Sequence, residues 1–265
     1  MSRLLAAGLL AALLAPPAPA RAEMPVDLEL VLAVDVSGSI DNQEATLQRD
    51  GYVTALSHPK VIAAIQAGMF GRIAVTYVEW AGVNFQNTIV PWRVIHDAKS
   101  AKSFAAELAD AIFTRERYTS ISGGIQYAMP LFDNNGYEGA RRVIDVSGDG
   151  PNNRGIYVEA ARDAALARGI IINGLPILND RFDGFGGQNL HDLDLYFEKC
   201  VVGGPGSFVV AAKDFGDFAQ AIVKKLILEI ADLGPPPRVI PAAERIAPPC
   251  NIGERMQLQR DQGFP

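Results

Sequence analysis

The sequence contains few of the side chains that enzymes use for covalent or acid–base catalysis. Among 265 residues there are only two cysteines and three histidines, and they do not combine at the spacing of a zinc site. The segments "DVSGS" and "DVSGDG" do not match the G-x-S-x-G pattern of a serine hydrolase. The segment "GGPGS" lacks the lysine of a phosphate-binding loop. These absences argue against zinc enzymes, serine hydrolases and P-loop nucleotide-binding proteins.

Long apolar segments are also absent, except near the N-terminus. Residues 4–15 form an uninterrupted apolar run after Arg3, and Ala20 and Ala22 are small residues that suit a cleavage site. This pattern is typical of a secretory signal peptide, because a membrane-spanning helix needs about 20 apolar residues. We therefore expect residues 1–22 to be removed after general export, leaving no membrane span and a periplasmic or extracellular protein.

The expected mature chain is acidic and contains both cysteines. Loss of Arg3 and Arg21 leaves 22 basic and 30 acidic residues and a net charge of −8. Such a charge disfavours nucleic acid and anionic membrane surfaces as partners, and it suits cations. Export to an oxidising compartment favours a disulfide between Cys200 and Cys250, and the alternative is two free thiols.

From residue 27 onward, short apolar segments alternate with helical patterns. Strands are predicted at residues 28–35, 72–80, 88–95, 142–147, 170–178 and 207–212. Helices are predicted at residues 43–57, 60–67, 99–113, 122–132, 157–168 and 215–230. Apolar strands separated by helices are typical of a mostly parallel sheet covered on both faces. The sequence therefore predicts one doubly wound α/β domain over residues 23–233, followed by an extended proline-rich tail over residues 234–265.

Polar side chains follow the first predicted strand. Asp35, Ser37 and Ser39 form the pattern D-x-S-x-S. Carboxylate and hydroxyl oxygens are hard ligands that suit Mg²⁺ or Mn²⁺. Serine and aspartate also favour the N-caps of helices. The pattern alone therefore leaves a metal site and a helix cap about equally open.

Two further segments favour the metal site. Thr119 precedes a predicted helix in "RYTSISGG", and Asp149 follows the strand at residues 142–147 in "DVSGDG". These segments and the end of the first strand should meet at one edge of the sheet. With these residues the chain resembles the von Willebrand factor type A family. Its metal-ion-dependent adhesion site, or MIDAS, combines D-x-S-x-S with a distant threonine and a more distant aspartate. The resemblance covers about residues 27–232.

The resemblance implies a ligand set, a metal and a kind of partner. The implied ligands are Asp35, Ser37, Ser39, Thr119 and Asp149. The hydroxyls would coordinate the ion, with the threonine acting directly or through water, and the aspartates would hold it largely through bound waters. The implied ion is Mg²⁺, with Mn²⁺ or Ca²⁺ as alternatives, and an acidic group of a partner protein would complete the coordination. Membership would also imply a six-stranded sheet in which residues 88–95 run antiparallel.

The chain departs from the family pattern at two positions. Gly148 stands where the family usually has threonine, and Asp145 lies inside a strand where the family generally has an aliphatic residue. A spacing of four places Asp145 on the same strand face as Asp149. A buried carboxylate needs a partner. Asp145 is therefore expected either to support the metal ligands from below or to form an ion pair with Arg141, Arg142 or another base.

Four more residues are candidates for a partner-binding surface beside the site. Glu79 and Trp80 end the second predicted strand, and Asp180 and Asp183 lie in the segment "NDRFDGFGGQN". The alternative for Trp80 is ordinary core packing. The alternative for the aspartate segment is an exposed turn, because its spacing fits no EF-hand.

No nucleophile or acid–base group is found together with matching partners, so we expect a binding protein and no enzyme. The first hypothesis is a secreted adhesion or assembly module in which a divalent cation captures an acidic residue of another protein. The second is a metal-assisted hydrolase with Asp145 as its base. The third is a scaffold whose site does not bind metal.

Overall fold

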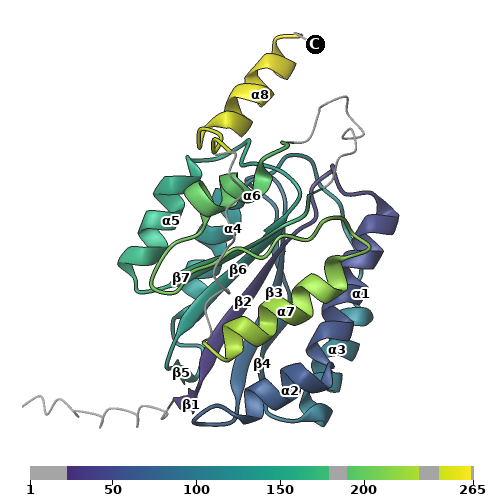
Figure 1. Ribbon diagram of the computed structural model, residues 1–265, viewed down its shortest axis with the longest axis vertical. Coiled ribbons are helices and arrows are strands. Elements are labelled where there is room, and N and C mark those ends of the chain that lie inside the picture. Colours follow the sequence, from purple (N-terminus) through teal and green to yellow (C-terminus); the bar gives the residue numbers. More distant parts are fainter. Residues whose placement is uncertain (1–22, 179–189, 233–244, 264–265) are drawn as a thin grey trace, which may run out of the picture.

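The computed structural model describes residues 23–178, 190–232 and 245–263, which fold around a five-stranded sheet (Figure 1). The strand order is β4 (Gln86–Ile95), β3 (Ile73–Trp80), β2 (Leu28–Asp35), β6 (Arg142–Gly148) and β7 (Ile171–Pro176). Four strands run parallel, and β4 pairs antiparallel with β3 at one edge. The predicted doubly wound, mostly parallel sheet with one antiparallel edge strand is confirmed.

The implied sixth strand is wrong for the described residues. Residues 207–212 form only two isolated bridges on this side of the sheet. Val209 pairs with Gly174 of β7, and Ala212 pairs with Ile177, just after β7. Pro176 has no N–H to donate to a ladder, and the side chain of Asn173 accepts a hydrogen bond from the Phe208 amide at 2.9 Å. These two residues interrupt continuous pairing. A separate parallel pair joins β1 (Met24–Val26) to β5 (Tyr137–Gly139).

Helices cover both faces of the main sheet. One face carries α1 (Asn42–Leu56), α2 (Pro59–Gln66), α3 (Ala98–Ala109) and α7 (Phe218–Ile230). The other carries α4 (Ile121–Ala128), α5 (Val158–Ala167) and α6 (Leu193–Tyr196), with a 3-10 turn at Met129–Phe132 and a π-helical turn at Phe197–Val201.

Strand β2 shows why the chain is buried on both faces. Successive side chains of a strand point to opposite sides. Leu30 and Leu32 accordingly pack in the core under α1 and α7, whereas Val31 and Ala33 pack in the core under α4 and α5. Because both faces are covered, β2 reads as a continuous apolar run that ends at Asp35. No helix in the described part of the chain is long and apolar enough to cross a membrane.

The sequence predicted an extended tail over residues 234–265, and this prediction is wrong for part of it. Within its described part, residues 252–261 form helix α8 (Ile252–Asp261) at the end of the molecule beyond α6 (Figure 1). The buried residues of α8 are Gly253 and Gln257, one helical turn apart. A face made of glycine and glutamine has no hydrophobic period, so the sequence pattern does not reveal this helix.

Candidate metal centre

The helix after the D-x-S-x-S segment has its own cap. The Asp41 carboxylate accepts hydrogen bonds from the amides of Gln43 and Glu44 at 2.8 Å. Glu44 in turn accepts from the Asp41 amide at 2.9 Å, which completes a capping box for α1. The cap role therefore falls to Asp41, and the side chains of D-x-S-x-S do not cap α1.

Asp35 ends β2 as a fully buried carboxylate. Its Oδ1 accepts a hydrogen bond from the Ser37 amide at 2.7 Å. Its Oδ2 is buried and has no hydrogen-bond partner among the described residues. Burial, and then the charge of nearby Asp149, raise the pKa of the Asp35 carboxyl well above its usual range. A cation beside Asp35 would compensate both effects.

Hydroxyl groups connect the end of β2 to the other two segments. Ser37 Oγ and Ser39 Oγ lie 3.0 Å apart, and Ser39 Oγ donates to Asp149 Oδ1 at 2.6 Å. Thr119 Oγ1 donates to Ser37 Oγ at 3.4 Å. The structure therefore brings together all five residues that the sequence suggested as ligands, from three separate segments. Ser37, Thr119 and Asp149 are buried, and Ser39 is half-buried.

The threonine loop is fastened to the loop after β6 by an asparagine. Asn153 Oδ1 accepts from the Thr119 amide at 2.9 Å, and the Asn153 amide donates to the Thr119 carbonyl at 2.8 Å. Sequence reasoning did not single out this residue. The signal was the asparagine pair that follows Gly150 and Pro151, because asparagine side chains readily bond to backbone groups in turns.

Gly148 is a site of close approach. A Cβ atom added there would lie 2.9 Å from Asp35 Oδ2 and 3.5 Å from the Trp80 ring. The absence of a side chain therefore lets the end of β6 pack directly against the Asp35 carboxylate. This contact gives a physical reason for glycine at a position where the resemblance leads one to expect threonine.

The donor set fits a hard divalent cation. Within the described ranges, no group of three or more His, Cys, Asp or Glu could hold a metal ion. The residues gathered here are two carboxylates and three hydroxyls, which are oxygen ligands of the type that Mg²⁺ and Mn²⁺ take. The buried, unbonded Asp35 Oδ2 is the observation that agrees best with a bound cation.

Asp145 belongs to a different cluster. It forms an ion pair with Lys225 of α7 at 2.7 Å, and Lys225 also lies 3.3 Å from Glu229. All three side chains are buried, and Asn173 donates to Glu229 at 2.8 Å. The ion-pair interpretation of Asp145 therefore applies, but the base is Lys225, and neither Arg141 nor Arg142 takes that role. Arg141 instead bonds to backbone carbonyls at the end of α7.

The surface candidates have other positions. Glu79 and Trp80 are buried, which corrects the expectation that they extend a partner-binding surface. Glu79 forms an ion pair with Arg49, and Trp80 packs against Gly124 of α4. The remaining two candidates, Asp180 and Asp183, lie outside the described residues, as does the expected signal peptide at residues 1–22.

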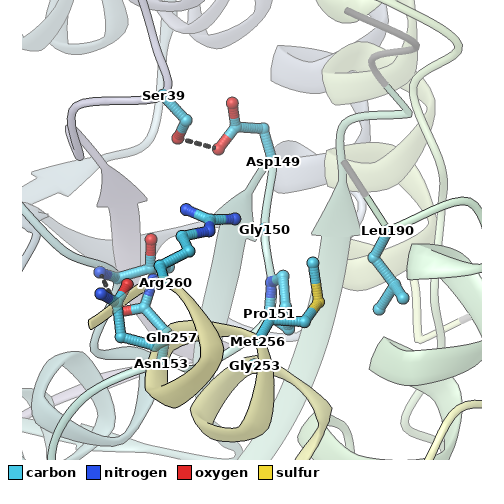
Figure 2. A pocket seen from close by; sticks show the side chains of 11 residues that line it. Ser39, Asp149, Gly150, Pro151, Asn153, Leu190, Gly253, Met256, Gln257 and Arg260 are labelled. Carbon is cyan, nitrogen blue, oxygen red and sulfur yellow. Dashed lines mark hydrogen bonds between the residues drawn. The ribbon is translucent and has the colours of Figure 1, made fainter. Parts of the chain in front are cut away.

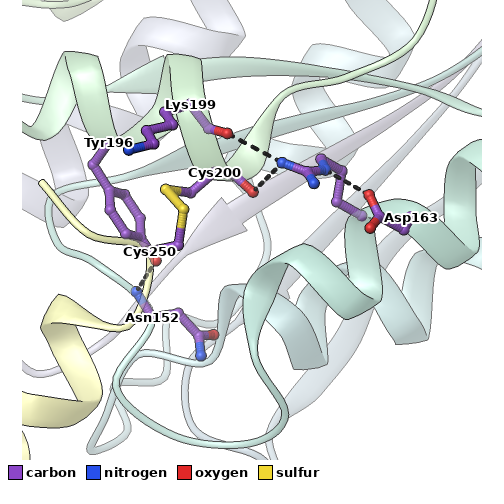
Figure 3. The surroundings of a disulfide bond; sticks show 7 residues. Asn152, Asp163, Tyr196, Lys199, Cys200 and Cys250 are labelled. Atoms are coloured by element: carbon purple, nitrogen blue, oxygen red, sulfur yellow. Dashed lines mark hydrogen bonds and ion pairs between the residues drawn. A yellow bond between two sulfur atoms is a disulfide. The ribbon is translucent and has the colours of Figure 1, made fainter. Parts of the chain in front are cut away.

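Helix α8 lies against the candidate centre. Figure 2 shows Met256, Gln257 and Arg260 of this helix facing the loop that contains Asp149. A disulfide between Cys200 and Cys250 attaches the chain just before α8 to the body of the domain (Figure 3). It is the pairing that export favoured at the sequence level. Sequence reasoning missed the other residues of this contact.

Comparison with solved structures supports the class of fold. Proximal thread matrix protein 1 from the mussel byssus, solved with a zinc-occupied MIDAS motif, matches 79% of this chain at 14% identity and a TM-score of 0.54. The von Willebrand factor type A protein from Catenulispora acidiphila matches 77% of this chain at 12% identity and a TM-score of 0.55. The pilus adhesin SpaC from Lactobacillus rhamnosus GG matches 78% of this chain at 14% identity and a TM-score of 0.54.

These similarities define the fold as that of a von Willebrand factor type A domain. The chain spans 49%, 43% and 31% of the lengths of those three chains, in the order given. No curated protein sequence matches the chain. The chain belongs to the family described as protein of unknown function (DUF1194), whose model matches residues 25–234. Helix α8 lies outside that match.

Proposed function

We propose that this chain is an exported protein-binding module whose binding depends on a divalent cation. The observation that carries the proposal is that three hydroxyls and two buried carboxylates from separate segments meet at one edge of the sheet, with Asp149 bonded to the Ser39 hydroxyl and Asp35 bonded to the Ser37 amide. The zinc-occupied MIDAS motif of the mussel protein, and the adhesin role of SpaC, support the same direction by analogy of fold. The apolar run at residues 4–15 supports export.

In this proposal the ion is held by Asp35, Ser37, Ser39, Thr119 and Asp149, and Mg²⁺ is the preferred ion, with Mn²⁺ or Ca²⁺ as alternatives. A bound ion supplies a positive centre with a position open to a carboxylate oxygen of a partner protein. Because the directly coordinating groups would be neutral hydroxyls, with the two aspartates acting largely through waters, the open position favours a carboxylate as a direct ligand. Asn153 keeps Thr119 beside the loop that follows β6.

We propose binding rather than hydrolysis because the one unusual base is engaged elsewhere. Asp145 is buried against Lys225, and it is not among the residues that line the cavities beside the candidate centre. A general base must come within hydrogen-bond reach of the proton that it removes. No specific observation therefore favours the hydrolase hypothesis.

The metal site can be tested with Asp35→Asn, which keeps the side-chain shape and removes one charge. We expect Mg²⁺ affinity, measured by titration calorimetry on the metal-free protein, to fall by about 10- to 100-fold, because the negative charge that holds the ion through bound waters is lost. The free energy of unfolding without metal should not fall, since the variant relieves repulsion between buried carboxylates. Asp50→Asn, the same charge change at an exposed position of α1, is the matched control. Equal Mg²⁺ affinity in Asp35→Asn and the wild type would contradict the proposal.

The partner can be sought by crosslinking in the native compartment, with Mg²⁺ or with a chelator. Crosslinked proteins that require both Mg²⁺ and an intact Asp35 would be the expected partners. Crosslinks that are identical for the wild type and Asp35→Asn would show that the centre plays no part in recognition.

A further inference from the structure

Polar contacts hold helix α8 against the candidate centre. Asn152 Nδ2 donates to Glu254 Oε1 at 2.7 Å, and Arg154 forms an ion pair with Asp261 at 2.9 Å. Gly253 lies so close to the Asn152 carbonyl that an added Cβ would be 2.1 Å from its oxygen. The disulfide fixes the chain before the helix. Contacts at both ends of α8, together with the tether, define one docked position.

Docking of α8 leaves a cavity of about 290 Å³ beside the centre. Ser39 and Thr119, two of the expected ligands, line it on the side of the domain. Arg260 and Gln257 line it from α8, and Arg117 lines it from the threonine loop. This volume lies at the small end of ligand pockets, so it suits one or two side chains of a partner rather than a large cofactor.

The lining of the cavity favours an anion next to the cation position. The guanidinium carbons of Arg117 and Arg154 lie 5.4 Å and 4.4 Å from the centroid of the Tyr118 ring. Two guanidinium groups are therefore held close together at this edge. The one carboxylate in the lining, Asp261, is paired with Arg154 and also accepts a hydrogen bond from Gln257 at 2.8 Å. Arginine binds carboxylates through paired N–H donors.

We propose that α8 completes the binding site, so that the chain recognises a peptide segment with two neighbouring carboxylates. One carboxylate faces the cation at Ser39 and Thr119, and the second enters the cavity between Arg117 and Arg260. This inference rests on the proposed function for the first carboxylate. It adds that helix α8, which lies outside the matched family region, forms the wall of the cavity that binds the second carboxylate.

The experiment uses two synthetic peptides with blocked ends, one with a single glutamate among glycines and serines, the other with two glutamates one residue apart. Affinity is measured by NMR titration of the mature, oxidised chain with excess Mg²⁺ or with a chelator. The variants are Arg260→Gln, Arg260→Lys and the matched control Arg255→Gln, which removes the same charge from an exposed position of α8. Mg²⁺ affinity and thermal unfolding are measured for each.

Arg260→Gln should lower the affinity for the two-glutamate peptide about 10-fold, which corresponds to the loss of a hydrogen bond between charged groups. The affinity for the one-glutamate peptide should fall less, and Mg²⁺ affinity should not fall, because Arg260→Gln removes a positive charge beside the cation position. Arg260→Lys should retain part of the difference between the peptides, and Arg255→Gln should behave as the wild type. If both peptides bind with Mg²⁺ but Arg260→Gln does not separate them, the role of α8 is overturned while the metal-dependent function stands. If the wild type binds neither peptide in a Mg²⁺-dependent way, the proposed function fails, and the inference fails with it.

A variant that releases the helix gives a second test. Cys200→Ser with Cys250→Ser removes the tether and should weaken the two-glutamate peptide in the same direction as Arg260→Gln. An increase in the affinity for both peptides would overturn the proposal, because it would mean that α8 covers the centre instead of completing it.

Discussion

Two groups of carboxylates lie on or beside strand β6, and the protein treats them differently. Asp145 and Glu229 share the buried ammonium of Lys225, which is supplied by α7. Asp149, four residues further along the chain and just past the end of β6, lies near Asp35, and its neighbours are the hydroxyls of Ser39 and Ser37. The first group contains its own counter-charge. The second leaves Asp35 with a buried oxygen that no described residue bonds.

The difference teaches which group stabilises the fold and which is available for binding. A buried charge that lacks its partner destabilises the fold. The internal lysine therefore makes the group of Asp145, Glu229 and Lys225, here called the lower cluster, a fixed part of the core. The group of Asp35, Asp149 and the neighbouring hydroxyls, here called the upper group, lies at the edge of the sheet, next to cavities that reach the surface. Sites of this kind commonly give up stability to keep a ligand position ready. The following predictions test this contrast, beginning with the largest expected effect.

Removal of the internal counter-charge should be the most damaging change. Lys225→Met leaves two buried carboxylates without their base, and we expect the free energy of unfolding to fall by about 3–5 kcal/mol in urea denaturation. Lys224→Met, at the exposed neighbouring position, should change it little. Adding Asp145→Asn and Glu229→Gln to Lys225→Met should recover most of the loss. If Lys225→Met were as stable as the wild type, the contrast between the two groups would be wrong.

A side chain at Gly148 should disturb the upper group alone. Gly148→Ala places a Cβ 2.9 Å from Asp35 Oδ2, and we expect a loss of about 1–3 kcal/mol in stability together with weaker Mg²⁺ binding. Gly150→Ala is the matched control, because its nearest contact would be Thr119 Oγ1 at 4.0 Å. Calorimetry with Mg²⁺ and urea denaturation measure both effects. Equal behaviour of the two alanine variants would show that the close approach at Gly148 is unimportant.

The lower cluster should also influence how stability depends on pH. Burial raises the pKa of Asp145 from its ordinary value of 3.8 to about 7, although the charge of Lys225 opposes the shift. Between these values the folded chain keeps a proton that the unfolded chain has lost, so stability falls as pH rises through this range. One such group changes stability by at most about 1.4 kcal/mol per pH unit. Asp145→Asn should make the measured slope less negative, and an unchanged slope between pH 5 and 7 would refute this account.

Much of the fold and the proposed ligand set could be predicted because their signals are local. Continuous apolar strands such as β2 show that both faces are covered, and the types and spacing of Asp35, Ser37 and Ser39 suit oxygen ligation as well as a helix cap. Thr119 and Asp149 could be added because their loops were expected at the same edge of the sheet, and because the resemblance to the von Willebrand factor type A family implies a threonine and an aspartate there. None of these steps needs the identity of a distant contact.

The features that could not be predicted depend on which distant surfaces meet. The partner of Asp145 is determined by how α7 packs on the sheet, so nearby arginines were poor guides to Lys225. The buried face of α8 contains Gly253 and Gln257, and it carries no apolar period. The missing sixth strand depends on Pro176 and on the side chain of Asn173, two details that an apolar pattern does not reveal.

The tether between Cys200 and Cys250 has a practical consequence for how the protein is prepared. A reducing cytoplasm does not maintain such a bond, whereas an oxidising compartment does. Material produced in the cytoplasm would contain the sheet and the D-x-S-x-S segment but would lack the covalent attachment of the helix that carries Arg260. Ligand screens on reduced and oxidised preparations would therefore sample two different surfaces of the same chain.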